Sequence, residues 1–417
     1  MSRNNSIKSV PRASGRQAFR RLVGGLAGLA ILGIAAAGHA EPGVSADKIV
    51  FGQSAALNGP AAALGTGMRE GILAAFAEAN NAGGVNGRKL ELVSHDDGYE
   101  PNAAIAATTK LVKEDNVFAL IGAVGTPTTV AVLPVVEEAK IPLIGAFTGA
   151  EVLRNPFKPL VVNVRASYFQ ETEVMVERLT KDLGVSKIAI MYQDDAYGRA
   201  GLAGVQKALA KRNMRLVAEG TYQRNTTAVK QAVLDIRKGD PEAVIMVGAY
   251  APCAEFIKLA KQVKMKSVFV NISFVGSDAL AKALGDMGAG VVVTQVVPFP
   301  GDTAVPIVAK YHAALKAANP SATPGFVSLE GYLVGRLAVQ ALSKVSGDPT
   351  RQGLLDAVSK LGAVDMGGIK LEYGAANNKG SDEVFLTVIQ PDGSLKPVET
   401  LKGLNTADTK SGGNDKG

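Results

Sequence analysis

The stretch IGAVGTPTTVAVLPVVEEAKIPLIGAFTGAEVLR, residues 121–154, decides the fold class. It begins at the end of an apolar, β-branched run and passes through Gly125. A helical pattern then starts with Thr126 and Pro127, and a second apolar run ends at Gly145. A strand, a helix and a strand in this order are typical of a βαβ unit. Two buried strands joined by a helix predict a parallel sheet that is covered on both faces.

The same rhythm extends in both directions along the chain. In the first part, the strand-like runs are residues 48–53, 89–95, 117–122 and 141–145. After a run at 161–165 the rhythm restarts, with strand-like runs at 187–193, 215–221, 243–248, 267–271 and 290–297. The last part predicts helices at 306–318, 327–344 and 350–360, and strands at 368–373 and 383–390. The pattern predicts an α/β protein with two similar, Rossmann-like, doubly wound halves.

The restart also predicts two lobes, because one core rarely organises more than ~250–300 residues. The expected parts are a first lobe of residues 41–165 plus 298–372 and a second lobe of residues 166–297 plus 373–401. The chain then crosses between the lobes near Arg165, Val297 and Tyr373, which predicts a three-crossing hinge.

Residues 1–40 have the composition of a secretory leader, with six basic residues, no acidic residue and an apolar run at 22–37. The run ends in small residues, so we expect cleavage after Ala40 and export to a periplasm. An uncleaved anchor is the alternative, but the run is shorter than the ~20 residues of a spanning helix. The pair Arg20 and Arg21 leaves twin-arginine export open beside general secretion. At the other end, residues 402–417 are nearly free of apolar side chains and predict a disordered tail.

Charge and cysteine content exclude several classes of function. Without the leader, the formal net charge falls from +7 to +1, so nothing favours binding to nucleic acid or to anionic lipid. Cys253 is the only cysteine, which rules out an intrachain disulfide and a cysteine-based zinc site. We expect it to be a buried structural thiol, and no cysteine near Ala40 can carry a lipid.

Threonines follow two consecutive strand-like runs, and both are candidates for binding an anion. Thr126 stands at the expected N-cap of a helix with Pro127 at its first position, and Thr148 and Gly149 follow the next run. A helix N-terminus offers free N–H groups and a positive dipole end, which suit a carboxylate. Plain helix capping is the alternative for each threonine. The carboxyl ends of parallel strands share one edge, where ligands of open α/β sheets collect.

Nucleotide binding finds little support. Gly65, Gly67 and Gly71 follow the first strand-like run, but their spacing is one residue too long for a dinucleotide fingerprint, and no Walker lysine follows.

From the strand at Ile49 onward, the motifs resemble those of the periplasmic leucine/isoleucine/valine-binding family, the type I binding proteins of branched-chain amino acid ABC importers. The motifs that carry the resemblance are LNGPAAALGTG, NNAGGVNGRKLEL, DDGYEP, IGAVGTPTT, PLIGAFTGAEVLR, YQDDAYGRAG and VGAYAPCAEFI. The resemblance implies a monomeric receptor that closes on a small carboxylate ligand and delivers it to an inner-membrane permease. A branched-chain amino acid or a related apolar or aromatic carboxylate is the implied ligand.

The resemblance also implies a set of site residues. The ligand's carboxylate would be held at Thr126, Thr148, Gly149 and Ala150. Tyr197 and Tyr250 would close over the ligand from the second lobe, and Tyr168 would lie on the loop that enters that lobe. Leu64 stands where several relatives place an aromatic wall. Ser273 and Phe274 complete the set of implied residues.

One departure from the family bears on the ligand. Amino acid receptors of this family carry an acid that pairs with the ligand's ammonium, whereas this chain has Ser273 and Phe274 at that place. A buried ammonium without a counter-charge is costly. Either the ligand lacks an α-ammonium, or another acid such as Asp195 or Glu255 substitutes.

Candidate catalytic groups have simpler interpretations. His95, Asp96 and Asp97 end a strand-like run and are interpreted as a turn rather than a metal site. Asp194 and Asp195 are interpreted as a helix cap rather than an acid/base pair. The chain has no G-x-S-x-G elbow. We therefore expect a protein without catalytic activity, cofactor or metal. The alternatives are a sensory receptor of the same fold and an exported α/β hydrolase.

Overall fold

The computed structural model describes residues 41–404. The predicted leader and residues 405–417 of the predicted tail lie outside the described residues. Within the described part, no helix is both long enough and apolar enough to cross a membrane.

The first sheet is five-stranded and parallel throughout, with the order β2-β1-β3-β4-β5. Its strands are β1 (Lys48–Ala55), β2 (Lys89–Asp96), β3 (Ala119–Ile121), β4 (Leu143–Ile144) and β5 (Val161–Val162). Leu120 pairs with Leu143, and Leu143 pairs with Val161. The loops that follow β3, β4 and β5 therefore lie at one edge of the sheet.

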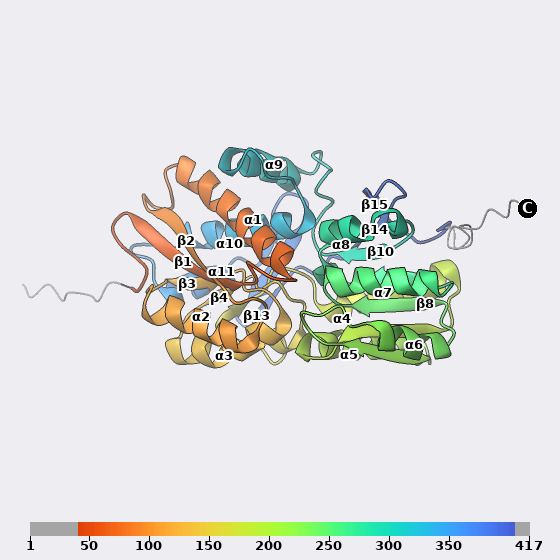
Figure 1. Cartoon of the computed structure of the whole chain (residues 1–417). Helices are drawn as coiled ribbons and strands as arrows, with labels where there is room; N and C mark the ends of the chain where they lie inside the picture. Colours follow the sequence, from red (N-terminus) through yellow and green to blue (C-terminus); the bar gives the residue numbers. More distant parts are fainter. Residues whose placement is uncertain (1–40, 405–417) are drawn as a thin grey trace, which may run out of the picture. The chain divides into compact units, whose positions relative to one another are not determined.

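Helices cover both faces of this sheet (Figure 1). They are α1 (Ala62–Asn81), α2 (Pro101–Lys113), α3 (Thr126–Ala139), α9 (Pro306–Ala318), α10 (Phe326–Leu342) and α11 (Arg351–Ser359). Ile121 and Ile144 pack in one apolar cluster with residues of α1 and α10, whereas Leu120 and Leu143 pack in another with residues of α2 and α3. The strands β3, β4 and β5 read as continuous apolar runs because they are buried on both sides, whereas the edge strand β2 is partly exposed.

The second sheet is seven-stranded, with the order β15-β14-β10-β9-β8-β6-β7. Its strands are β6 (Ile188–Gln193), β7 (Ala218–Tyr222), β8 (Ala243–Val247), β9 (Val268–Asn271), β10 (Val292–Gln295), β14 (Phe385–Ile389) and β15 (Leu395–Val398). The first five are parallel, and β14 and β15 add antiparallel strands beside β10.

Helices also cover both faces of the second sheet. They are α4 (Tyr168–Leu183), α5 (Ala196–Ala210), α6 (Lys230–Lys238), α7 (Tyr250–Gln262) and α8 (Ser277–Leu284). The 3₁₀ turns in the described chain are η1 (Glu151–Leu153), η2 (Ser273–Val275) and η3 (Gly285–Gly288). Ile190 packs in the cluster that contains residues of α4 and α5, and its neighbour Met191 packs in the cluster with residues of α6 and α7. The two halves thus share one construction, which confirms the predicted fold class.

A small third sheet, β11 (Ala363–Asp365), β12 (Lys370–Gly374) and β13 (Asn377–Gly380), lies where the chain returns to the second sheet. Asn378 ties it to β5: its Nδ2 donates to the carbonyl of Val161 at 2.9 Å, and its carbonyl accepts from Asn163 N at 2.9 Å. The Tyr373 hydroxyl donates to the Asn163 carbonyl at 2.8 Å. The chain therefore stays beside the first sheet through Gly380.

Helices α1 and α10 approach each other closely because both carry glycine at their contact. A β-carbon built on Gly71 would lie 1.9 Å from the Ser328 carbonyl oxygen, and one on Gly331 would lie 2.3 Å from that of Met68. Backbone contacts backbone here. The contact seats α10, and Glu330 on it, against the first sheet.

Replacing Gly71 by alanine should lower the free energy of unfolding by about 1–3 kcal/mol, because the added methyl has no space beside a backbone oxygen. Urea unfolding of the protein measures this. Gly67→Ala in the same helix is the matched control, since its β-carbon would meet the Val327 side chain, 2.9 Å from Cγ1 and 3.1 Å from Cβ, rather than a backbone oxygen. A Gly71→Ala protein as stable as Gly67→Ala would contradict the packing described.

Candidate functional site

Thr126 and Thr148 lie side by side although they follow different strands. Their hydroxyl oxygens are 2.7 Å apart, and both side chains are buried. Thr126 begins α3 after β3, and Thr148 follows β4, the neighbouring strand. The parallel register brings them together, as the sequence pattern predicted for the carboxyl ends of adjacent strands.

The cap of α3 differs from the prediction. Gly125 is the N-cap, with φ of 95°, and Thr126 is the first helical residue and makes no side-chain capping bond. The prediction of Thr126 as N-cap was therefore wrong by one residue. A β-carbon at Gly125 would lie 2.1 Å from the Tyr99 ring, so a glycine is required both for the positive φ and for the approach of Tyr99. The Thr126 hydroxyl is left free for a partner other than its own helix.

Gly149, Ala150 and Tyr168 form the adjoining wall. The Ala150 N–H donates to the Thr148 hydroxyl at 3.2 Å, and the Tyr168 N–H donates to the Gly149 carbonyl at 2.7 Å. The Tyr168 ring packs on Gly149, where a β-carbon would lie 2.6 Å away. Its hydroxyl is buried and has no hydrogen-bond partner among the described residues. Burial raises the pKa of Tyr168, so this hydroxyl remains a donor at neutral pH.

An aromatic cluster continues from this wall. The ring of Phe274 lies 4.5 Å from that of Tyr197, 5.3 Å from that of Phe147 and 5.9 Å from that of Tyr99, measured between centroids. Tyr168 lies 5.5 Å from Tyr197. Phe147 and Tyr99 belong to loops of the first sheet, whereas Tyr197 and Phe274 come from the second. The cluster is therefore built by both halves of the chain.

Leu64 and Tyr250 both lie close to Gly276, two residues after Phe274 in the chain. A β-carbon at Gly276 would lie 2.6 Å from Leu64 and 3.8 Å from Tyr250. Leu64 is buried, and Tyr250 is half-buried at the start of α7.

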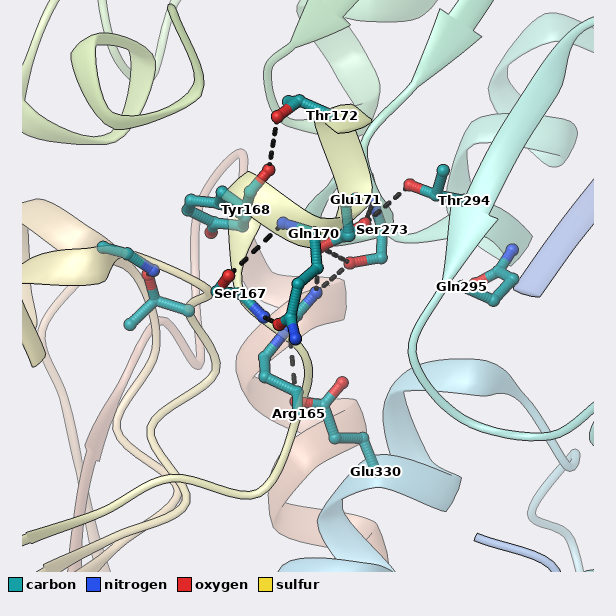
Figure 2. Close-up of polar contacts among 12 residues, drawn as sticks. Arg165, Ser167, Tyr168, Gln170, Glu171, Thr172, Ser273, Thr294, Gln295 and Glu330 are labelled. Carbon is teal, nitrogen blue, oxygen red and sulfur yellow. Dashed lines mark hydrogen bonds and ion pairs between the residues drawn. The ribbon is translucent and has the colours of Figure 1, made fainter. Parts of the chain in front are cut away.

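Ser273 faces a buried ionic cluster instead (Figure 2). Its N–H donates to Glu171 Oε2 and its hydroxyl to Glu171 Oε1, both at 2.9 Å, while Arg165 Nη2 donates to the same hydroxyl. Thr294 donates to Glu171 Oε2 at 2.6 Å. On the far side, Arg165 Nη1 lies 3.5 Å from Glu330 Oε1. The guanidinium, at the first crossing, thus lies between carboxylates of α4 and α10.

Electrostatics within this cluster are set by burial. Burial raises the pKa of Glu330 from 4.5 to about 7, and the nearby Arg165 opposes the rise. Burial alone would lower the pKa of Arg165, but the carboxylates of Glu330 and Glu171 raise it. Nε and Nη1 of Arg165 have no hydrogen-bond partner among the described residues.

Direct contacts join the two halves at the rim. Arg224 Nη2 donates to Glu100 at 2.7 Å, and Gln193 Nε2 donates to the Tyr99 hydroxyl at 3.1 Å. A cavity of about 330 Å³ lies beside them, bounded by Tyr99, Gln193, Tyr222, Pro60, Ala61, Asn225, Thr226, Thr227, Ala249, Ala251 and Pro252. No charged side chain lines it in the described structure.

The candidate catalytic groups have structural partners. His95 Nε2 is 2.7 Å from Asp115, and Asp195 caps α5 by accepting from the Tyr197 N–H at 2.9 Å, as predicted. Asp194 pairs with Arg199. Cys253 is buried, which raises the pKa of its thiol, as expected for a structural residue. Residues 41–404 contain no group of three or more acids, histidines or cysteines arranged to hold a metal ion.

Sequence reasoning missed several members of the site. Tyr99 and Phe147 were within the recognised motifs DDGYEP and PLIGAFTGAEVLR, but no signal separated them from core aromatics. Arg165 was predicted only as a place where the chain crosses between the lobes. Its position directly after an apolar strand is the one signal that would have indicated a buried charge. Glu171 and Glu330 lie in helical patterns, which predict exposed charged faces.

Two doubly wound α/β halves, linked by crossings and sharing a site of hydroxyl and aromatic side chains, define the class of type I solute-binding receptors. The chain belongs to the periplasmic binding protein family, whose sequence profile matches residues 48–394. This confirms the resemblance seen in the sequence motifs.

Individual relatives agree with this assignment. A possible leucine/isoleucine/valine-binding protein from Rhodopirellula baltica is 39% identical, with a TM-score of 0.82 over 85% of this chain and 97% of that structure. A substrate-binding periplasmic protein from Ralstonia solanacearum is 28% identical, with a TM-score of 0.80 over 84% of this chain and all of that structure. Leu/Ile/Val-binding protein homolog 7 of Brucella abortus is 25% identical over 85% of this chain and 92% of its own length.

The raised pKa of Glu330 predicts a pH dependence of stability. The folded state binds this proton more tightly than the unfolded state, so the free energy of unfolding falls as pH rises from about 5 to about 7. Glu330→Gln cannot ionise and should reduce this fall by about 1–3 kcal/mol. Urea unfolding at pH 5 and at pH 7.5 measures the difference.

Glu177→Gln, on the surface of α4, is the control for the pH experiment. The hydrogen bond from Lys181 lowers the pKa of Glu177, so the contribution of Glu177 to the free energy of unfolding changes only below the interval from pH 5 to pH 7.5. Equal pH slopes for the wild type and Glu330→Gln would contradict the assignment.

Proposed function

We propose that this chain is the extracytoplasmic receptor of an ABC importer and binds a small organic acid between its two halves, with the ligand's carboxylate on Thr126 and Thr148. The observation that carries the proposal is the buried pair of hydroxyls, 2.7 Å apart at the carboxyl ends of neighbouring strands. Membership in the periplasmic binding protein family supports the role.

The local chemistry suits a carboxylate. In the described structure the two hydroxyls bond to each other, so one of their two protons is spent within the pair. A carboxylate can accept from both, and the unpartnered Tyr168 hydroxyl offers a further donor. The N-terminus of α3 adds free N–H groups and a favourable dipole. Each hydrogen bond to a charged group is worth about 1.5–3 kcal/mol.

Capture follows from hinge closure between the lobes. The predicted lobes were residues 41–165 plus 298–372 and residues 166–297 plus 373–401. We move the third crossing past Gly380, so that the first lobe takes residues 298–380 and the second begins again at 381, because β13 pairs with β12 and Asn378 bonds to Asn163. Contacts such as Arg224 to Glu100 close the rim. A ligand held by both lobes favours the closed state. The receptor, a monomer exported by means of its leader, would then bind the permease in its ligand-loaded form.

Replacing both threonines by valine should lower affinity at least about 100-fold, because two charge-assisted hydrogen bonds are lost with little change of shape. Isothermal titration with L-leucine and with 4-methyl-2-oxopentanoate measures this, since both carry the carboxylate.

Thr129→Val is the matched control for the threonine variant. Thr129 lies in the same helical turn and is buried, and its hydroxyl has no hydrogen-bond partner in the described structure. The Thr129→Val protein should bind both probes with the affinity of the wild type. Unchanged binding by Thr126→Val/Thr148→Val, or binding of neither probe by the wild type, would refute the proposed function.

A further inference from the structure

We infer that the ligand is a monocarboxylate without an α-ammonium group, with an apolar branched or aromatic body. The inference rests on the proposed function and names its substrate class. It depends on the aromatic cluster that both halves build and on the acids near it, because Glu171 and Asp195 already accept hydrogen bonds from other residues of the chain.

Glu171, the buried acid bonded to the residue before Phe274, already has hydrogen-bond partners. Glu171 accepts hydrogen bonds from Ser273 N, the Ser273 hydroxyl and the Thr294 hydroxyl, and Arg165 Nη2 lies 3.4 Å from it. Both carboxylate oxygens are thus occupied. An ammonium could pair with Glu171 only by displacing these partners.

Asp195, which the sequence left open as a substitute, is committed too. It accepts from the Tyr197 N–H at 2.9 Å, from Gln193 Nε2 at 2.7 Å and from Arg224 Nη1 at 2.8 Å. Glu100, on the facing loop, accepts a hydrogen bond from Nη2 of the same Arg224 guanidinium at 2.7 Å. Glu255, the second substitute considered, does not line the cavity of about 330 Å³ beside Tyr99.

The acids next to Ser273 and Phe274 are paired with a buried arginine. Arg165 donates to the Ser273 hydroxyl, directly before Phe274, and it is 1% exposed. Two of its nitrogens lack hydrogen-bond partners in the described part of the chain. Glu171 lies 3.4 Å and Glu330 3.5 Å from this guanidinium, so both carboxylates beside it already compensate a positive charge and neither is free of a cationic partner.

Aromatic faces can themselves bind a cation, but arginines of this chain lie over three rings of the cluster. The Arg165 guanidinium is 4.8 Å from the Phe147 centroid and 5.9 Å from that of Tyr168, and the Arg224 guanidinium is 5.9 Å from the Tyr99 centroid. Tyr197 packs in tilted pairs with Tyr168 and with Phe274. An uncharged body loses little on entering such surroundings, whereas an unpaired ammonium loses its hydration.

The test compares acids that differ only at the α-carbon. The full chain is exported with its own leader, purified, freed of bound ligand by unfolding and refolding, and titrated calorimetrically. The probe pairs are L-leucine with 4-methyl-2-oxopentanoate and L-phenylalanine with phenylpyruvate. We expect the keto acid of at least one pair to bind at least about tenfold more tightly than its amino acid, because the keto acid has no ammonium group that would be buried without a counter-charge.

Two results separate this inference from the proposed function. If an amino acid binds as tightly as its keto acid, and the binding is lost in Thr126→Val/Thr148→Val, the proposed function stands and the inference is overturned. If no probe of either pair binds, both are overturned.

A charge variant gives an independent readout. Phe274→Glu places a carboxylate in the aromatic cluster and should raise the affinity ratio of leucine to 4-methyl-2-oxopentanoate at least about tenfold, because it supplies the missing counter-charge. Phe274→Gln, of the same size and uncharged, should leave the ratio unchanged. Near-ultraviolet circular dichroism checks that both fold, and the wild-type comparison decides the matter if they do not. An equal shift of the ratio in both folded variants would contradict the inference.

Discussion

Burying the Arg165 guanidinium is the constraint on which the arrangement between the two halves depends. A charge removed from water must find opposite charges and acceptors, or its burial costs several kcal/mol. Here Glu171 and Ser273 lie on one side and Glu330 lies on the other, so a single side chain at the first crossing ties α4, η2 and α10 together. The linkage between the two halves and the chemistry of the candidate site therefore share one residue.

That constraint bears on the proposed ligand site. Glu171 accepts from Ser273 and pairs with Arg165, so both of its oxygens are already in use. The proposed anion-binding side is built differently, from hydroxyls and backbone of the first sheet, with Thr126 and Thr148 in direct contact. In the proposed site, a carboxylate would be held by these hydroxyls, and the aromatic cluster would contact an uncharged body.

Much of the architecture was predictable because it depends on local pattern. Strand-like runs such as 187–193 and 243–248 correspond to β6 and β8, and the helix predicted at 306–318 is α9. Errors lie where tertiary contact overrides pattern. The run at 161–165 forms only the two-residue β5, because Asn163 turns to bond Asn378. The strands β11, β13 and β15 were not predicted, since short edge strands carry little hydrophobic periodicity.

By itself, the sequence determined the class of fold and the position of the threonines, because apolar periodicity and the turn chemistry of Gly125 act over a few residues. Only the tertiary structure decided which charges compensate each other. Glu171 and Ser273 are 102 residues apart, and Arg165 and Glu330 belong to segments that meet only after both sheets have formed. Charge pairing depends on distance in space, and a helical glutamate has the same local pattern whether it faces water or a buried arginine.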